Sequence, residues 1–383
     1  MVTNGGGGYS RCRDREVTRY REDLTRDCWG SFFYLKDVES GRVWSAAFQP
    51  TLAQPDDYHV TFSADKADFR RLDGDVETHT EVFVSPEDDV EVRRLTITNH
   101  GQDVRALEVT SYLEVTLAVR GADHAHKSYS NLFVETEAIE QSRALLFSRR
   151  PRSAEEPRFW GFHALACEDS AGCSWTYETD RAAFLGRLRT PYDAAAITEG
   201  ARLTQSVGPV LDPICAIRQP LVIEPGQSAR LAYVTGAAES RERVLALAEK
   251  YADIGNAQRA ADLAWSTSQI ELRDLGITPE ESVTFLRLAS RLLLTDPHSR
   301  LKVLTEVENR LPVSALWSIG ISGDDPILLV KIERLEEAPL VRQALLAHQY
   351  WRSKGFVCDL VILNTKPSAY ASEDRKSTRL NSS

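Results

Sequence analysis

Four carboxylates lie close together in the C-terminal third of the chain, where they could carry acid–base chemistry. Asp324 and Asp325 follow the turn residues 321–323, and Glu306 and Glu308 precede them. Breaking or transferring a glycosidic bond needs a proton donor for the leaving oxygen and a nucleophile or base, which two carboxyl groups usually supply. Asp324 is therefore the predicted catalytic residue, with a turn or helix cap as its alternative. Glu306 and Glu308 are expected on a solvated face.

Aromatic and charged residues suited to sugar binding occur near the N-terminus and near residue 180. Proteins bind sugars with aromatic rings against the apolar ring faces and with Asp, Asn or Arg groups at the hydroxyls. Asp23, Asp27 and Trp29 supply such side chains, and Asp180 with Arg181 forms a second pair. These five are the predicted substrate-binding residues. The alternative is structural, with Trp29 in a core and Arg–Asp pairs joining loops.

The sequence predicts neither a metal site nor a cofactor. Asp123, His124 and His126 offer two imidazoles at a spacing that can share a strand face, but a polar loop is the preferred interpretation because no second ligand cluster accompanies them. Gly5 to Gly8 lack the Lys-Ser/Thr and the preceding strand of a phosphate loop, so a flexible segment is expected. Neither a G-x-S-x-G nucleophile elbow nor a local Cys-His signature occurs in the sequence.

Composition and charge narrow the class of protein. The 383 residues are 42% hydrophobic and 27% charged, which is typical of a folded globular chain with two domains or one large domain and part of another. The formal charge of −10 argues against a surface for nucleic acid or anionic lipid, so neutral ligands are expected. No apolar run reaches the length of a membrane span. We therefore expect a soluble piece without direct contact to nucleic acid or membrane.

The cysteines predict a reducing compartment. They are spread along the chain without a C-x-x-C pair or a histidine at zinc spacing. Buried, reduced thiols are the preferred interpretation, and a cytoplasmic location follows from it. The six are Cys12, Cys28, Cys167, Cys173, Cys215 and Cys358.

The chain changes character near residue 240. From Trp29 to about Val234 it consists of short β-rich runs between turn residues, such as 76–84, where β-branched residues alternate. Many strands and few helices predict a sandwich. Ser240 is then an N-cap before an amphipathic helix, and Thr278-Pro279-Glu280-Glu281 combines an N-cap, a proline at the first helical position and a capping box.

A short β-helix-β segment is expected near the end of the chain. The apolar runs 327–330 and 361–363 flank a predicted helix over about 339–354, which Gly355 ends. Residues 374–383 lack hydrophobic patterning and are interpreted as a non-native tail. The expected organisation is an N-terminal segment (1–28), a β-sandwich (29–238), a helical linker with the start of a catalytic-type domain (239–373), and that tail (374–383).

Stretches along almost the whole chain resemble the central and C-terminal region of cyclic β-1,2-glucan synthases, which is related to the family 94 glycoside phosphorylases and to glycosyltransferase family 36. Their order along the chain is more specific than any one short motif. The stretches that carry the resemblance are residues 8–11 (Gly-Tyr-Ser-Arg), 21–23 with 25–30, 43–46, 84–89, 131–134, 177–181, 211–214 and 320–324.

The resemblance implies a mainly β part followed by an α part: a large antiparallel β-supersandwich, linker helices and an (α/α) barrel, here incomplete, that holds the catalytic carboxylates. Full-length synthases also carry a membrane-embedded glycosyltransferase part, so we expect a fragment on the cytoplasmic side of a bacterial inner membrane, with Met1 an internal methionine. Cys12 and Tyr20 stand where the family more often has tryptophan. Thr365 stands where a glutamate is usual, which puts activity in doubt.

Three functions stay open at this point. The chain is either an enzyme fragment that transfers or cleaves β-1,2-linked glucosyl units, with its active site cut short, or a binding and scaffolding module that orients the glucan. A β-glucan phosphorylase fragment is the third, although no clear anion site is present. The sequence does not distinguish hydrolysis, phosphorolysis and transglycosylation.

Overall fold

The computed structural model describes residues 1–21, 23, 25–153, 156, 158–169, 173–294, 310–365 and 378–379. They belong to two compact units, Met1–Thr267 and Ser268–Ser383. No helix within the described ranges is both long enough and apolar enough to cross a membrane.

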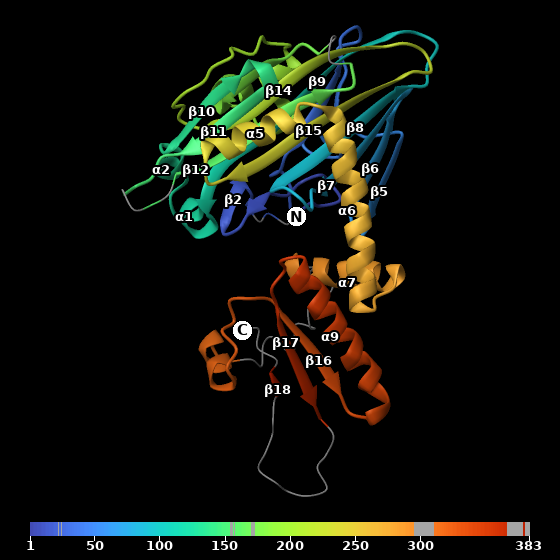
Figure 1. Ribbon diagram of the computed structural model, residues 1–383, viewed down its shortest axis with the longest axis vertical. Coiled ribbons are helices and arrows are strands. Elements are labelled where there is room, and N and C mark those ends of the chain that lie inside the picture. The colour runs from blue at the N-terminus through green and yellow to red at the C-terminus, as the bar shows by residue number, and fades with distance from the viewer. Residues whose placement is uncertain are drawn as a thin grey trace, which may run out of the picture. The chain divides into compact units, whose positions relative to one another are not determined.

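Two antiparallel sheets form most of the first unit (Figure 1). The seven-stranded sheet contains β1 (Arg11–Cys12), β2 (Arg15–Thr18), β3 (Phe32–Asp37), β4 (Val43–Ser45), β9 (Arg105–Val119), β13 (Thr176–Asp180) and β14 (Pro213–Ile223). The eight-stranded sheet contains β5 (Asp57–Phe62), β6 (Lys66–Asp73), β7 (Val76–Val84), β8 (Val90–Asn99), β10 (Val134–Ile139), β11 (Ala144–Arg149), β12 (Phe159–Cys167) and β15 (Ser228–Ala238). The predicted sandwich is confirmed.

Strand order shows how the sheets are connected. The path through the first sheet is β1-β2-β9-β14-β13, with β3 pairing with β9 and β4. The second sheet runs β10-β11-β12-β15-β8-β7-β6-β5. Strand β9 is 15 residues long and pairs with β2, β3 and β14, so it is the central element of the first sheet.

Successive side chains of β14 point to opposite faces of its sheet, and both faces are buried. Cys215 and Ile217 belong to the core between the two sheets. Ile214 and Ala216 face the other way and pack with Phe184 of the short helix α3 (Arg181–Leu185). Because both faces are covered, the strand is apolar at successive positions, which explains the weak alternation in its sequence.

Two helices cover the outer face of the eight-stranded sheet. Helix α5 (Arg241–Tyr251) packs Val244 and Leu247 against Phe162 and its neighbours, and the first half of α6 (Ile254–Leu275) extends the same apolar layer (Figure 1). The predicted N-cap is confirmed, since Ser240 Oγ accepts from the backbone N–H of Arg243 at 3.2 Å. Strand gives way to helix near residue 240, as the sequence predicts. The unit boundary follows Thr267 because α5 and the first half of α6 both pack on the sandwich.

The loops of the sandwich contain short helices that the sequence analysis did not predict. These are α1 (Arg120–Ala125), α2 (Lys127–Asn131), α3 and α4 (Ala195–Thr198), with the 3₁₀ turns η1 (Glu140–Ser142) and η2 (Pro191–Asp193). They are too short for a periodic apolar stripe to reveal them.

The second unit combines helices with a small sheet. It contains α7 (Pro279–Leu293), η4 (Val313–Ile319), β16 (Ile327–Ile332), η5 (Leu335–Glu337), α9 (Ala338–Ser353), β17 (Asp359–Asn364) and β18 (Thr378–Arg379). The predicted capping box and the predicted β-helix-β segment are both confirmed, and β16 pairs with β17 in parallel. Strand β18, within the tail that the sequence set apart, pairs with β17.

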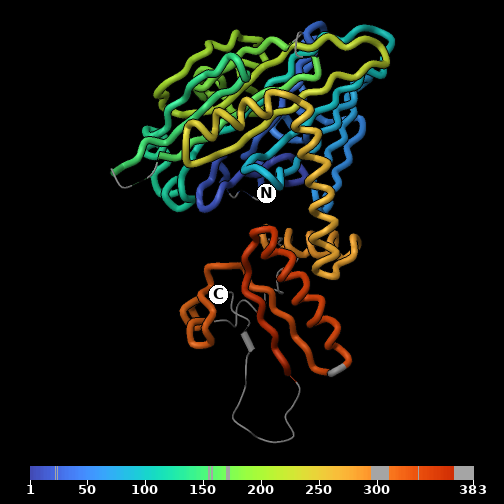
Figure 2. The backbone as a smooth tube through the Cα atoms, viewed as in Figure 1, coloured from blue at the N-terminus to red at the C-terminus, as the bar shows by residue number. Residues whose placement is uncertain are grey.

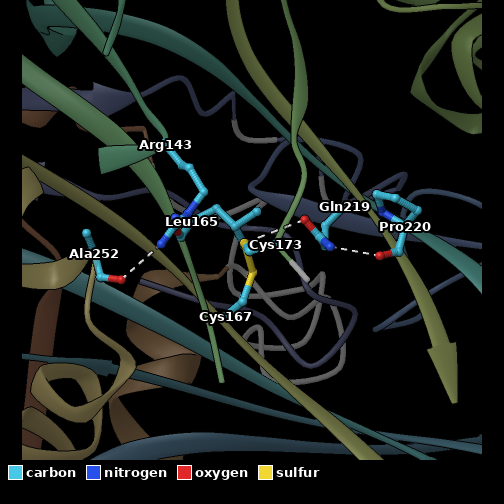
Figure 3. The surroundings of a disulfide bond; sticks show 7 residues. All are labelled: Arg143, Leu165, Cys167, Cys173, Gln219, Pro220 and Ala252. Atoms are coloured by element: carbon cyan, nitrogen blue, oxygen red, sulfur yellow. Dashed lines mark hydrogen bonds between the residues drawn. A yellow bond between two sulfur atoms is a disulfide. The ribbon is translucent and has the colours of Figure 1, made fainter. Parts of the chain in front are cut away.

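A disulfide joins Cys167, the last residue of β12, to Cys173, with the two Cα atoms 6.0 Å apart (Figure 3). The prediction that all six cysteines are reduced is therefore wrong for this pair. The spacing between the two gave no recognised motif, and only the fold shows that they are close enough to bond. The other four cysteines are free. Cysteine usage consequently no longer supports a reducing compartment.

Candidate functional site

Buried charged side chains meet at one end of the sandwich around Arg19. The Arg19 guanidinium donates to both carboxylate oxygens of Asp123, at 3.1 and 3.0 Å, and to Glu114 Oε2 at 3.0 Å. It also donates to Asn131 Oδ1 at 2.5 Å. Figure 2 shows the N-terminal segment, in blue, at the same end of the first unit as the teal segment that follows β9. Arg19 and Asp123 are at most 1% exposed, so this network is part of the interior.

Three elements hold Arg19 in place. The Arg19 backbone N–H donates to the Glu114 carbonyl of β9 at 2.8 Å, which continues the pairing of β2 with β9. Asp123 lies in α1, which begins where β9 ends, and Asn131 ends α2. A guanidinium has five donors, so an interior position requires several acceptors, and these three elements supply them.

Half-exposed side chains form the rim of this group. Lys127 donates to Glu114 Oε2 at 3.2 Å, and Arg181 donates to Glu114 Oε1 at 2.7 Å. Asp212 accepts from Asn131 Nδ2 at 2.9 Å and lies 3.6 Å from both Lys127 and Arg181. The name Arg19 cluster is used below for Arg19, Arg21, Glu114, Asp123, Lys127, Asn131, Arg181 and Asp212.

The cluster holds its carboxylates in the ionised form. Burial by itself raises the pKa of Glu114, but Lys127, Arg181 and Arg19 outweigh it and lower that pKa to about 2. Burial likewise opposes ionisation of Asp123, and the hydrogen bond from Arg19 with the charge of Arg21 leaves its pKa below the usual value. Neither group can hold a proton near neutral pH, so neither can act there as a general acid.

The rim has the chemistry of a sugar-binding surface. Lys127 and Arg181 are donors, and Asp212 is an acceptor; their side chains are 26 to 30% exposed. Trp29 is half-buried beside them, and the Lys127 ammonium lies 5.4 Å from its ring centroid. A hydroxyl-rich ring needs such alternating donors and acceptors beside an aromatic face. The arrangement therefore suits binding of a neutral polyhydroxyl ligand.

The structure brings together two of the five predicted substrate-binding residues directly. Trp29 contacts Lys127, and Arg181 belongs to the Arg19 cluster. Asp180, next to Arg181, accepts from the backbone N–H of Ala182 at 2.8 Å as the N-cap of α3.

The other two predicted residues have local roles. Asp23 accepts from the Thr25 side chain at 2.6 Å and from two backbone N–H groups of its own turn. Asp27 accepts from Thr3 Oγ1 at 2.5 Å and lies against Gly5 and Gly7, so it fastens the glycine-rich segment that the sequence suggested to be flexible.

Asp324 lies in an exposed turn between Gly323 and β16 of the second unit. Its backbone N–H donates to Ser322 Oγ at 3.2 Å, and Asp325 follows it, also exposed. Glu306 and Glu308 lie outside the described residues. The catalytic role of Asp324 stays a prediction.

The segment 123–126 differs from the expected polar loop. Asp123 is a fully buried residue of α1 and accepts from Arg21 as well as Arg19, which makes the loop interpretation wrong for it. A separate group of possible metal ligands, Asp68, His79 and Glu81, lies on β6 and β7. Lys66 bonds both of those carboxylates, at 3.0 and 2.7 Å, and Arg94 donates to Glu81 at 2.6 Å, so two cations already balance the two carboxylates.

Sequence reasoning missed Arg19, Glu114 and Lys127, and it assigned Asp123 to a polar loop. One signal was present for Glu114, which lies between the apolar residues Leu113 and Val115 of β9 and is 5% exposed. A charged residue with apolar neighbours on a buried strand needs a counter-charge. Its partners come from residues 19, 127 and 181, and only the fold brings these positions together.

Comparisons with known proteins agree with the sandwich. Residues 1–254 match the family model described as glycosyl hydrolase 94, supersandwich domain. A cyclic beta-(1,2)-glucan synthase, NdvB, from Rhizobium meliloti (strain 1021) is 35% identical over 375 residues, which are 97% of this chain and 13% of that protein.

Two phosphorylases show weaker similarity. An N,N'-diacetylchitobiose phosphorylase from Vibrio furnissii is 26% identical over 68% of this chain and 32% of its own length. A solabiose phosphorylase from Paenibacillus borealis is 24% identical over 57% of this chain and 27% of its own length. The chain thus spans less than a third of the length of each of these relatives.

Proposed function

Because the chain belongs to the glycosyl hydrolase 94 supersandwich family, we propose that it is part of a carbohydrate-active enzyme acting on β-1,2-glucan. The observation that carries this proposal is the similarity to a cyclic β-1,2-glucan synthase, which extends over nearly the whole chain. The chemistry of the Arg19 cluster supports it, since the rim presents donors, acceptors and an aromatic ring to a neutral ligand.

Within that enzyme, we assign glucan binding to the rim of the Arg19 cluster. Glu114 and Asp123 are held as anions, so they position Arg181, Lys127 and Arg21 and do not transfer protons. Lys127 and Arg181 then donate to glucan hydroxyls, Asp212 accepts from them, and Trp29 contacts the apolar face of one ring. Asp180 keeps α3, and with it Arg181, in place.

We assign proton transfer to the helical part, with Asp324 as the candidate acid and residues 239–373 as linker and start of the catalytic-type domain, ahead of the tail at 374–383. Exposure of Asp324 and its neighbour Asp325 supports access to a substrate. We further propose that the whole protein carries a membrane-embedded glycosyltransferase part. The region described by this chain would lie on the cytoplasmic side of the inner membrane. The disulfide of the sandwich is the feature that speaks against a reducing compartment.

Binding of linear β-1,2-glucan by the 383-residue chain tests the assigned surface. We expect saturable binding in calorimetry, and about a tenfold loss of affinity, about 1.4 kcal/mol, in Trp29→Ala and in Lys127→Met. Lys331→Met is the matched control, because Lys331 is an exposed lysine of β16 paired only locally with Glu333. Equal losses in Lys127→Met and in the control would contradict the assignment.

A phosphorylase is the second candidate, because two relatives carry that activity in their names. Incubation with linear β-1,2-glucan, with and without inorganic phosphate, separates the two. Cyclic or longer glucan without phosphate supports the synthase-type reaction. Release of a sugar phosphate only when phosphate is present supports the phosphorylase.

A further inference from the structure

A polar pocket lies near the start of β9, at the opposite end of that strand from the Arg19 cluster. Its volume is about 120 Å³, so it is large enough to hold several water molecules. Its wall is formed by two hairpin turns, one after Asp37 and one at Gly74, and by Arg105 at the start of β9. Since Arg105 and Glu114 are nine positions apart on β9, about 30 Å separate the pocket from the Arg19 cluster.

Charged groups of both signs line this pocket. Asp37 and Asp73 are 6% and 3% exposed, while Asp75 is open to solvent. Arg105 donates to Asp75 Oδ2 at 3.2 Å and lies 3.6 Å from Asp37 Oδ2. Arg42 donates to Asp73 Oδ1 at 3.4 Å. Arg71, buried behind the wall, also donates to both oxygens of Asp73, at 2.6 and 2.9 Å. Three guanidinium groups therefore balance the three carboxylates, which disfavours a multivalent cation and equally a strong anion.

Two buried donors in the pocket wall have no acceptor. Trp44 is 2% exposed, and its Nε1 has no hydrogen-bond partner among the described residues. Arg105 Nε likewise has no partner in the part of the chain that the structure describes. A buried donor without an acceptor costs free energy, so a ligand oxygen at this place would be stabilising. The Arg42 guanidinium lies 5.8 Å from the Trp44 ring centroid, and its side chain is 49% exposed, so it is free to move aside.

We propose that this pocket binds one hydroxylated sugar ring, a glucosyl unit. Vicinal hydroxyls donate to Asp75 and Asp37 and accept from Arg105 and Arg42, and a ring oxygen or hydroxyl accepts from Trp44 Nε1. Asp75 is exposed at the open side of the pocket, so part of the ring stays in solvent there. The choice of glucose rests on the proposed function, whereas the polyhydroxyl chemistry rests on the pocket alone.

The test follows the indole N–H signal of Trp44 by NMR in the full chain, assigned through Trp44→Phe. The probe is sophorose, the β-1,2-linked glucose disaccharide. We expect a saturable shift of this signal in the unmodified chain and at least a fivefold weaker affinity in Asp75→Asn. Asp75 is exposed, so that variant keeps the fold. Glu39→Gln removes the same charge from the neighbouring turn, where Glu39 is exposed and outside the pocket, and should bind as the parent does.

The outcomes separate this inference from the proposed function. A Trp44 shift that persists in Trp29→Ala supports the pocket, even if linear glucan shows no binding at the Arg19 cluster. A silent Trp44 signal at saturating sophorose overturns the pocket, even if the Trp29 signal moves. A shift with calcium chloride and none with sophorose also overturns it, as does equal affinity in Asp75→Asn and the parent.

Discussion

Replacing Glu114 by glutamine should destabilise the first unit by an amount that depends on pH. Its pKa is about 2, against a usual 4.5, and at about 1.4 kcal/mol per pH unit this difference corresponds to about 3 kcal/mol. The folded-state pKa is depressed, so the contribution is fully present above pH 4.5 and is lost as pH falls toward 2. The side chain is only 5% exposed, so solvent screening reduces this little.

The assay is urea unfolding of the parent chain and Glu114→Gln, followed by circular dichroism of the strands at pH 7 and pH 3. We expect the parent to be more stable by about 3 kcal/mol at pH 7 and by only about 1 kcal/mol at pH 3, where Glu114 in the unfolded chain is mostly protonated. Glu168→Gln is the control, because Glu168 pairs with Arg230 at an exposed site and should contribute less than about 1 kcal/mol. A stability difference that is the same at both pH values would refute the electrostatic reasoning.

Three further changes test other parts of the fold. Cys173→Ser should lower the free energy of unfolding by about 2 kcal/mol from the loop that the disulfide closes, and added reductant should abolish the difference in urea titrations; an unchanged difference would contradict it. Thr278→Ala should cost about 1 kcal/mol by removing the cap of α7, seen as faster hydrogen exchange in its first turn, whereas unchanged exchange would show that the capping box contributes nothing. Gly161→Ala should cost about 2 kcal/mol in thermal unfolding, because the added Cβ would lie 2.3 Å from Phe147; a neutral result would mean that the ring moves freely.

Much of the fold could be predicted from local signals. Strand β7 has the bounds of the alternating run 76–84, and α5 begins after the cap at Ser240, because both features depend on neighbouring residues alone. The β-helix-β segment likewise followed from apolar runs and from Gly355. The short helices α1 and α2 could not be predicted, since contacts with β9 and with Arg19 hold them in place.

The candidate site was only partly predictable for the same reason. Trp29 and Arg181 were chosen by residue type, and the structure places both beside Lys127 or Glu114. The residues that hold them are 80 or more positions from Arg19 in the sequence, and no alternation or cap links such distant positions. The Cys167–Cys173 bond escaped prediction although the two residues are close in sequence, because their spacing fits no known metal or redox motif.

Strand β9 contains both Arg105, in the wall of the polar pocket, and Glu114 of the Arg19 cluster. Glu114 and Tyr112 lie on its outer face, whereas Leu113 and Val115 face the core between the sheets. A single inserted or deleted residue upstream of Glu114 would therefore turn that carboxylate into the apolar interior and displace Arg105 relative to the hairpin tips at the same time. An insertion or deletion within β9 should therefore disturb both the Arg19 cluster and the proposed pocket, whereas the loops beyond the ends of this strand should tolerate one better.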